Sequence, residues 1–339
     1  MAESDGRLPA TRRRLLGLLA DGDFHSGKDL GAQLGLSRGA IWKHIQALES
    51  LGLDVFRVPG RGYRLARPLE LLDAAAILDA LPAEQRQRID LNLLDTTAST
   101  NAWLVARASS ASNRIAVCLA EHQSGGRGRR GRQWVSPFGR NLYLSVDWPF
   151  ASLPRDFSAL SLLVGLAVQQ AIEALGVDGV RLKWPNDLLA AMPDQPLRKL
   201  GGILLEMRGE PPGPCHVVIG IGINVAMPER GDVAASIDQP WINLDALADS
   251  GVDRSSLAGK VLAELLRLLP EFETRGFAPF KQAWESVDAF AGCNVDIIDG
   301  DRRTSGVARG VSEQGALLLD TGNGIERIVV GDVSMRSSS

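Results

Sequence analysis

The sequence predicts a multidomain α+β protein with a small helical head, a central domain built on a mixed sheet, and a terminal domain of short strands. Three observations support this fold class. Residues 1–67 hold eleven Lys and Arg against seven Asp and Glu, a net of +4, whereas the other 272 residues hold 26 against 33, a net of −7. Strand-like runs dominate residues 90–225 around one long apolar helix. Short strands separated by glycines fill the chain from residue 291.

Composition limits the class of protein. With 339 residues, 45% hydrophobic and 23% charged, the chain is an ordinary globular protein rather than a disordered or fibrous one. Its cysteines, Cys118, Cys215 and Cys293, are too far apart to indicate a disulfide framework or a zinc site, which predicts a reducing cytoplasm. No apolar run approaches the roughly 20 residues of a membrane span, so no membrane partner is expected.

The head carries three helical patterns. Leucines recur at helical spacing in Arg12–Ala20, and a second pattern covers Gly27–Leu34 before a glycine breaks it. Ser37 is a favourable N-cap for a third helix, Arg38–Ser50. Apolar residues of this third helix fall on one face, which predicts that they are buried: Ile41, Ile45 and Leu48.

A hairpin is predicted next, with strands Asp54–Val58 and Tyr63–Leu65 around a Pro-Gly-Arg-Gly turn. Helix, helix, turn, helix and hairpin is the order of a winged helix-turn-helix domain, which places its third helix in the DNA major groove. The predicted DNA contacts lie on that helix and hairpin: Ser37, Arg38, Trp42, Lys43, Gln46, Arg61 and Arg64. A small protein-interaction domain with a solvated basic face is the alternative.

A helix over about Leu69–Leu81 is expected to lead into the central domain. The strand-like runs there are Asp90–Leu94, Ile115–Ala120, Leu142–Val146, Arg181–Trp184, Gly202–Glu206 and Val217–Gly222. A long apolar helix is expected over Ala159–Leu175, and a helical tract over Arg254–Trp284. Since several strands are joined by short turns, an antiparallel or mixed sheet is favoured over a parallel one.

The terminal segment predicts a small β-barrel. Its expected strands are Asn294–Ile298, Arg302–Val311, Leu317–Asp320 and Ile325–Val330. The predicted domains are therefore 1–67, 68–290 and 291–339.

Residues 125–132, GGRGRRGR, are the most unusual local composition. A dinucleotide-binding reading of GxGxxG fails because a strand, rather than a helix, is expected next. A glycine-rich loop with guanidinium groups is typical of binding to phosphate and carboxylate. A solvated basic loop and a nucleic-acid contact are the alternatives.

Three weaker signals accompany this loop. In Lys183-Trp-Pro-Asn-Asp187 the Asn-Asp pair favours a turn, with Asp187 as a magnesium or hydrogen-bonding carboxylate the sharper alternative. Lys199, beside glycines, is either a solvated edge lysine or a ligand contact. Ser99-Thr100 favours a helix N-cap. Many donors, positive charge and no nucleophile together suit attack of a substrate carboxylate on the α-phosphorus of ATP.

At these residues the sequence closely resembles the bacterial biotin-protein ligases that double as biotin operon repressors. The matching strings are DTTASTN (95–101), GRGRRGR (126–132), SPFG (136–139), KWPND (183–187), KLGGI (199–203) and GIGIN (220–224), with Gln123, Trp134 and residues 141–145, 315–319 and 334–336. The resemblance covers essentially the whole chain. It implies a central domain like that of class II aminoacyl-tRNA synthetases and an SH3-like terminal barrel.

The resemblance also implies a two-step reaction, in which biotin and MgATP give biotinyl-5'-AMP and a carrier-protein lysine then takes the biotin. The implied catalytic residues are Lys199, Arg129 and Arg127. The implied biotin contacts are Ser99, Thr100, Asn101, Gln123, Arg127, Gly128, Arg129, Lys199, Gly202, Gly220 and Gly222. The implied ATP and adenylate contacts are Arg129, Arg132, Trp134, Asn186, Lys199, Asn224 and Trp241. Asp187 is the implied magnesium ligand.

Residues 226–240 are polar and non-periodic, so we expect this stretch to be mobile when empty and ordered over the adenylate. In the family this ordering favours a homodimer that places two winged helices on operator DNA, with biotinyl-5'-AMP as corepressor. The implied partners are thus the biotin carboxyl carrier protein of acetyl-CoA carboxylase, operator DNA and a second copy. The alternatives are a lipoate or octanoyl ligase of the same fold, and a DNA-binding regulator that senses a small acid without catalysis.

Overall fold

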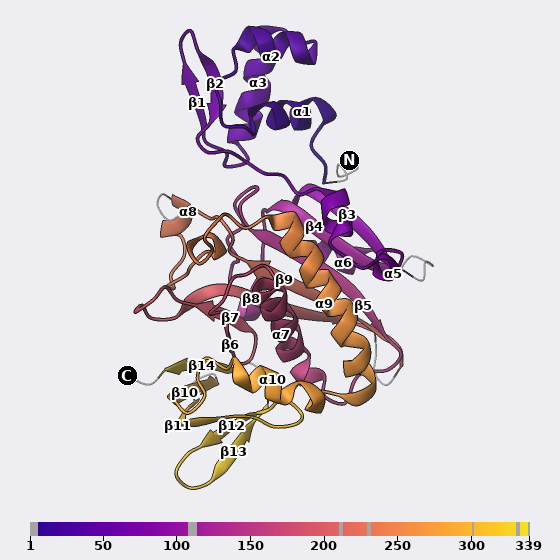
Figure 1. Ribbon diagram of the computed structural model, residues 1–339, viewed down its shortest axis with the longest axis vertical. Helices are drawn as coiled ribbons and strands as arrows, with labels where there is room; N and C mark the ends of the chain where they lie inside the picture. Colours follow the sequence, from indigo (N-terminus) through magenta and orange to yellow (C-terminus); the bar gives the residue numbers. More distant parts are fainter. Residues whose placement is uncertain are drawn as a thin grey trace.

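The computed structural model describes residues 6–107, 114–209, 213–228, 232–299, 302–329 and 333–337. Figure 1 shows the head at one end of the molecule, the central domain in the middle and the terminal sheet at the other end. The predicted three-part organisation, with a mixed central sheet, is confirmed.

The head has the predicted order of elements. They are α1 Ala10–Leu19, α2 Gly27–Leu34, α3 Arg38–Glu49, β1 Val55–Val58 and β2 Gly62–Leu65. Ser37 caps α3 as predicted, because its side chain accepts a hydrogen bond from the backbone N–H of Ala40 at 3.2 Å. The inward-facing residues Ile41, Ile45 and Leu48 are fully buried. Their cluster also takes in Leu69 and Phe138, so the head core includes side chains from beyond its own sequence.

The expected helix over Leu69–Leu81 is wrong in its first half. Only α4, Ala74–Asp79, is helical, and a short α5, Ala83–Arg86, follows it. The preceding backbone is bonded elsewhere: the N–H of Leu69 donates to the carbonyl of Ala20 in the head (2.9 Å), and the N–H of Leu72 donates to Glu121 in the central domain (2.5 Å). Residues 69–72 therefore form a joint tied at both sides.

The central sheet has seven strands in the order β3-β4-β5-β9-β8-β7-β6. Their bounds are β3 Ile89–Thr97, β4 Ile115–Gln123, β5 Leu142–Phe150, β6 Arg181–Lys183, β7 Asp187–Ala190, β8 Arg198–Arg208 and β9 Cys215–Ile223. Only β3 and β4 pair in parallel, and the other neighbours are antiparallel. The six predicted strands are present, several of them longer than expected, and β7 is an additional strand.

Helices cover both faces of this sheet. The side chains of β4 alternate between two apolar clusters, with Val117 and Leu119 in the main core and Cys118 and Ala120 in a smaller cluster that holds Leu104. The main core packs against α7, Leu160–Glu173, and α9, Arg254–Arg275, which run side by side in Figure 1. The smaller cluster packs against α6, Thr100–Ala106. The remaining helices are α8 Asp232–Ala235 and α10 Lys281–Ser286, so the predicted tract 254–284 is broken after Arg275.

The terminal domain is a five-stranded antiparallel sheet in the order β13-β12-β11-β10-β14. Its strands are β10 Asn294–Asp299, β11 Arg302–Val311, β12 Leu317–Asp320, β13 Ile325–Ile328 and β14 Val333–Ser337. The predicted antiparallel strands are confirmed, with β14 in addition. Barrel closure stays a prediction, as does the last residue of the predicted strand Ile325–Val330, which lies outside the described residues. Within the described part of the chain, no helix is long and apolar enough to cross a membrane.

Candidate functional site

A network of buried polar side chains lies where α6 meets β4 and β5. Gln123, at the end of β4, accepts from both the backbone N–H (2.9 Å) and the hydroxyl (3.1 Å) of Thr100. The hydroxyl of Ser145 lies 2.7 Å from that of Thr100 and 2.6 Å from the side-chain oxygen of Asn101. The predicted cap is confirmed, since the side chain of Ser99 accepts from the N–H of Ala102. The start of α6 and the end of β4 thus bring together four of the residues predicted to contact biotin: Ser99, Thr100, Asn101 and Gln123.

Asn101 depends on a glycine for its position. A Cβ added at Gly220 would lie 2.3 Å from the Asn101 side-chain oxygen, so only glycine leaves room for this side chain. The Asn101 amide donates to the carbonyl of Leu204 (3.3 Å) and to the carboxylate of Glu206 (2.8 Å). The space beside Gly220 is therefore filled by the Asn101 side chain, and the hydrogen bonds of Asn101 extend the network to β8.

The arginine loop joins β4 to β5 without an α-helix. A single 3-10 turn spans Arg129–Gly131, and Arg130 has a left-handed φ of 59°, which is uncommon for a residue with a Cβ. The N–H of Gly128 donates to the carbonyl of Arg132 (2.7 Å), and the N–H of Trp134 donates to that of Gly126 (2.9 Å). The loop is therefore closed on itself, and the rejection of a dinucleotide-binding loop is correct.

The loop reaches across the sheet to polar partners on other strands. Arg127 forms an ion pair with Glu206 of β8 at 2.9 Å, with side chains 48% and 27% exposed. Arg129 donates to the side-chain oxygen of Asn186 at 3.2 Å, while the Asn186 amide donates to the carbonyl of Ile203. Arg132 is exposed.

Lys199 lies at the start of strand β8 and forms a close ion pair with Asp187 at 2.7 Å. Both side chains are mostly buried, at 16% and 19% exposed. They lie beside Gly202, whose added Cβ would be 3.5 Å from each of them. The Lys199 ammonium also lies 5.8 Å from the centroid of the Trp134 ring. The solvated edge lysine is therefore wrong, because this lysine is buried beside a carboxylate and an indole.

Trp134 packs directly on the sheet. A Cβ at Gly222 would lie 2.7 Å from its indole ring, so the close packing of Trp134 requires glycine at this position. The indole N–H is buried and has no hydrogen-bond partner among the described residues. A buried donor without a partner is costly, and a ligand oxygen would satisfy it.

Asn224 and Trp241 lie near Lys199 through the backbone. The N–H of Lys199 donates to the carbonyl of Pro240 and its carbonyl accepts from Ile242, both at 3.0 Å, which places half-buried Trp241 alongside. The Asn224 amide is buried and donates to the carbonyls of Lys199 and Ile242 at 3.4 Å. Of the stretch 226–240, residues 229–231 lie outside the described part of the chain.

Residue patterns alone missed two members of this site. Glu206 lies in a strand assigned to the apolar core, and Ser145 lies in an apolar strand that gave no sign of a ligand. Their role depends on partners far away in sequence: Arg127 is 79 residues from Glu206, and Asn101 is 44 from Ser145. A polar residue in an otherwise apolar strand was the available signal.

The metal prediction rests on a single carboxylate. Asp187 is paired with Lys199, and the described residues contain no group of three or more His, Cys, Asp and Glu side chains that could hold a metal. Magnesium commonly binds through one or two carboxylates together with substrate phosphates. Asp187 therefore fits magnesium only if the phosphates of ATP supply the other ligands.

The outer face of α3 is the candidate nucleic-acid interface. Its exposed residues are those predicted from the sequence: Ser37, Arg38, Trp42, Lys43 and Gln46. In the hairpin, the guanidinium of Arg61 lies 4.2 Å and that of Arg64 5.0 Å from the centroid of the Phe24 ring. The hairpin arginines are thus held by an aromatic ring, with Arg61 exposed and Arg64 half-buried.

Comparison with known families gives three matches in chain order. Residues 11–64 match a helix-turn-helix (HTH) domain, residues 93–224 the biotin/lipoate A/B protein ligase family, and residues 291–336 the biotin protein ligase C-terminal domain. Among solved structures, the biotin protein ligase from Aquifex aeolicus in complex with biotin and ATP has a TM-score of 0.62 and 30% identity. It covers 74% of this chain and 99% of that chain.

Relatives of full length are also similar. The bifunctional ligase/repressor BirA of Escherichia coli (strain K12) is 43% identical over 96% of this chain and 97% of its own length. The protein of the same name from Bacillus subtilis (strain 168) is 32% identical over 93% of this chain and 95% of its own length. The biotin--[acetyl-CoA-carboxylase] ligase of Mycobacterium tuberculosis is 34% identical over 77% of this chain. The chain therefore belongs to the biotin protein ligase family, in the branch of bifunctional ligase/repressors.

Proposed function

We propose that this protein is an ATP-dependent biotin-protein ligase. It forms biotinyl-5'-AMP from biotin and ATP, then transfers biotin to a lysine of the carrier protein of acetyl-CoA carboxylase. One observation carries the proposal. Five consecutive strands of the sheet, β4-β5-β9-β8-β7, bring three groups together. These groups are the polar network around Asn101, the arginine loop, and the Lys199–Asp187 ion pair. A relative 34% identical is named as a ligase for acetyl-CoA carboxylase.

The polar network is suited to the ring of biotin. Its ureido group has both donors and an acceptor, and the side chains of Ser99, Thr100, Asn101 and Gln123 offer the complementary groups. Thr100, Asn101 and Gln123 are already held by hydrogen bonds to each other or to Ser145, and Ser99 by the N–H of Ala102. A site positioned in advance loses little side-chain entropy when the ligand binds.

Positive groups are suited to bring the biotin carboxylate and the α-phosphate together. Arg127, Arg129 and Lys199 neutralise the two anions, while Gly128 and Gly202 allow the backbone to lie close. A carboxylate oxygen attacks the α-phosphorus and pyrophosphate leaves. The carrier amine then attacks the acyl carbon, the bond to the phosphate oxygen breaks, and AMP leaves. Arg127 and Lys199 form ion pairs with Glu206 and Asp187, and the substrate anions would replace these carboxylates as their partners.

The nucleotide is proposed to lie between Trp134 and the 240–242 segment. The unpaired indole N–H of Trp134 offers a hydrogen bond, and Trp241 offers a flat surface for the adenine. Asn186, Asn224 and Arg132 complete the proposed adenylate contacts. Residues 226–240 would cover the adenylate and exclude water from it. Magnesium bound at Asp187 would neutralise the phosphates of ATP.

A direct test measures pyrophosphate release from ATP with biotin, with lipoate and with neither, followed by label transfer to a biotin carrier domain. Release that depends on biotin, followed by transfer, is expected. Release with lipoate in place of biotin would support a second candidate, a lipoate ligase. The matched family includes ligases for lipoate as well as for biotin. Release that ignores both acids would overturn the proposal.

We further propose that the head represses the biotin operon. The exposed face of α3 and the match to a helix-turn-helix domain support DNA binding. Biotinyl-5'-AMP would act as corepressor by favouring a homodimer through the central domain, with one head on each half of an inverted repeat. A gel-shift assay on the promoter of the biotin operon is expected to show binding that tightens when biotin and ATP are both present.

The three predicted domains, 1–67, 68–290 and 291–339, remain our proposed boundaries, and the cytoplasm remains the proposed location. The free cysteines support that location, since Cys118 and Cys215 are buried without partners for a disulfide.

A further inference from the structure

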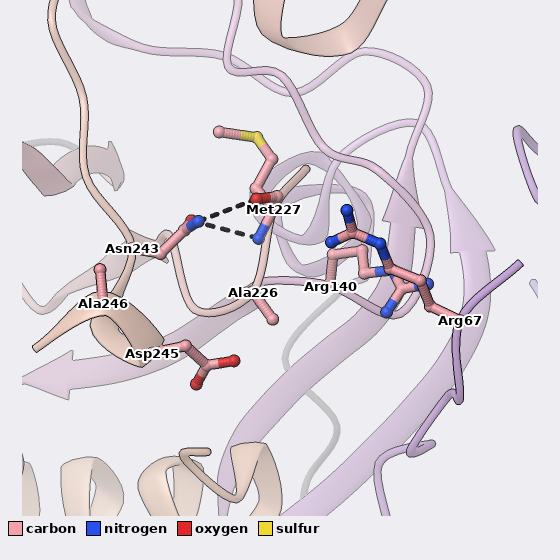
Figure 2. A pocket seen from close by; sticks show the side chains of 7 residues that line it. All are labelled: Arg67, Arg140, Ala226, Met227, Asn243, Asp245 and Ala246. Carbon is pink, nitrogen blue, oxygen red and sulfur yellow. Dashed lines mark hydrogen bonds between the residues drawn. The ribbon is translucent and has the colours of Figure 1, made fainter. Parts of the chain in front are cut away.

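A pocket lies between the end of the head and the central domain. It has a volume of about 700 Å³, and its wall includes Arg67 at the end of the head, Arg140 just before β5, and Met227, Asn243 and Asp245. Figure 2 shows the two arginines on one side and Asn243 and Asp245 on the other. Arg67, Arg140, Asn243 and Asp245 are not among the residues assigned above to biotin, ATP or DNA, whereas Met227 belongs to the stretch proposed to cover the adenylate.

The two arginines give this pocket an unbalanced positive wall. Arg140 is half-buried and donates to the carbonyl of Pro68 at 3.2 Å, which ties it to the joint. Burial, followed by the charges of Arg67 and Arg254, lowers the pKa of Arg140, with Asp54 acting in the opposite direction. Among the described residues, neither Arg67 nor Arg140 forms an ion pair with a carboxylate. The two guanidinium groups therefore repel each other, and Asp54 offsets this repulsion only in part.

The acid in the pocket does not remove this imbalance. Asp245 is exposed, and its Oδ1 accepts from the backbone N–H of Val252 at 2.9 Å. One carboxylate facing two guanidinium groups leaves a net charge of about +1 on the lining side chains. Guanidinium forks match the geometry of phosphate oxygens, which they bind in pairs of hydrogen bonds.

The floor of the pocket is held in place. Asn243 is buried and bonded at both ends to Met227: it accepts from the N–H at 3.1 Å and donates to the carbonyl at 2.8 Å. The N–H of Ala226 donates to the carbonyl of Arg140 at 2.9 Å. The wall that carries Arg140 is thus fixed to the start of the 226–240 stretch, so an anion would meet a surface formed in advance.

We propose that this pocket binds a small phosphate-class anion between the guanidinium groups of Arg67 and Arg140. Inorganic phosphate, pyrophosphate and the phosphate of a mononucleotide share this chemistry. The bound anion connects the joint of the head to the central domain and lies beside the residues that begin the proposed adenylate cover. Binding to this pocket does not depend on ligase activity and can be measured without it.

The experiment is calorimetric titration of the full chain with inorganic phosphate, pyrophosphate and AMP in separate arms, at constant ionic strength because exposed charges are screened by salt. Arg67→Gln and Arg140→Gln are compared with the wild type. Arg88→Gln, which removes an exposed arginine of the central domain that does not line the pocket, is the matched control. For at least one of the three anions, we expect the Kd to rise about tenfold or more in each pocket variant relative to the wild type. The control variant is expected to keep the wild-type Kd.

The arm with the tightest such binding identifies the source of the phosphate. Equal affinity in the wild type and in both pocket variants would overturn the proposal, as would the absence of binding to the wild type in all three arms. Arg67 is exposed, so Arg67→Gln is expected to fold even if the loss of half-buried Arg140 disturbs the joint. Failure of the ligase test would leave this binding result standing, because calorimetric binding requires no turnover and its loss is measured in variants of residues that the ligase proposal does not use.

Discussion

The cations that we propose for DNA binding in the head and for ligand binding in the central domain lie in opposite surroundings. On α3, Arg38 and Lys43 are exposed and form no ion pair within the described residues. In the central domain, Lys199 and Arg127 each lie within 3 Å of a carboxylate, at 2.7 and 2.9 Å. An open basic face suits a polyanion such as DNA, which brings many charges and sheds counter-ions. A cation that is already paired with a carboxylate suits a small anion, which must displace that carboxylate in order to bind. Binding of the anion would therefore break an internal ion pair.

Removal of the Lys199 ammonium, which is paired with Asp187, is expected to have the largest effect. Lys199→Ala is expected to slow adenylate formation about 10²- to 10³-fold, because it deletes a positioned positive group where charge develops and leaves Asp187 unpaired. Pyrophosphate release with biotin and ATP measures the effect. Lys260→Ala, a half-buried lysine of α9 away from the site, is the control and should retain the wild-type rate. A near-normal rate in Lys199→Ala would show that the Lys199–Asp187 pair is structural only.

A second substitution tests the network through its glycine. In Gly220→Ala the new methyl group would lie 2.3 Å from the Asn101 side-chain oxygen, so Asn101 must move. We expect the KM for biotin to rise about tenfold or more and the KM for ATP to change little. Gly251→Ala is the matched control, since nothing lies within 4 Å of its added Cβ. Equal rises in both KM values would indicate general damage to the sheet and would refute a biotin-specific role for Asn101.

The open face of the head predicts a different kind of loss. In the double variant Arg38→Ala and Lys43→Ala, operator binding with biotin and ATP is expected to weaken about tenfold. The slope of log K against log salt should fall by about 0.9 for each phosphate contact removed. Ligase activity should be unchanged, because these side chains lie on the outer face of α3. Unchanged operator binding would exclude α3 as the recognition helix, and Arg88→Ala serves as the charge control.

The head and the central domain also differ in how far the sequence predicts their structure. Local signals were sufficient in the head: Ser37 caps α3 and the apolar spacing of Ile41 and Ile45 sets its buried face. In the central domain the strand runs were visible as apolar segments. The joint at 69–72 was not, because its N–H groups are bonded to Ala20 and Glu121, whose positions depend on the tertiary fold. The short strands β7 and β14 were missed for the same reason, since each is defined by its neighbours in a sheet.

In the candidate site, the sequence identified the cationic residues but not the carboxylates that pair with them. The cationic residues were recognisable from GRGRRGR and KLGGI, but their counter-ions were not. Glu206 reads as an ordinary strand residue until the fold places it 2.9 Å from Arg127. Whether a charge is open or compensated is thus a property of the fold, and it separates the two functions more clearly than the net charge of each domain.

Asp288 is a half-buried carboxylate of the central domain, and we expect its replacement to have the smallest effect of these substitutions. Burial raises the pKa of Asp288 to about 6 from its usual 3.8, and within the described residues it has no ion pair, although it accepts from the N–H of Phe290 at 3.0 Å. A carboxyl whose pKa is raised in the folded state stabilises that state below the unfolded pKa, and this stability is lost as the pH rises through about 6. Asp288→Asn keeps an acceptor for Phe290 and removes the charge. We expect its free energy of unfolding at pH 8 to exceed the wild-type value by roughly 1 kcal/mol, allowing for partial screening by solvent, with the difference vanishing near pH 4. Denaturant unfolding at both pH values measures this, with exposed Asp249→Asn as the control. An equal gain at both pH values would mean that the benefit comes from packing and that the central domain tolerates an uncompensated charge after all.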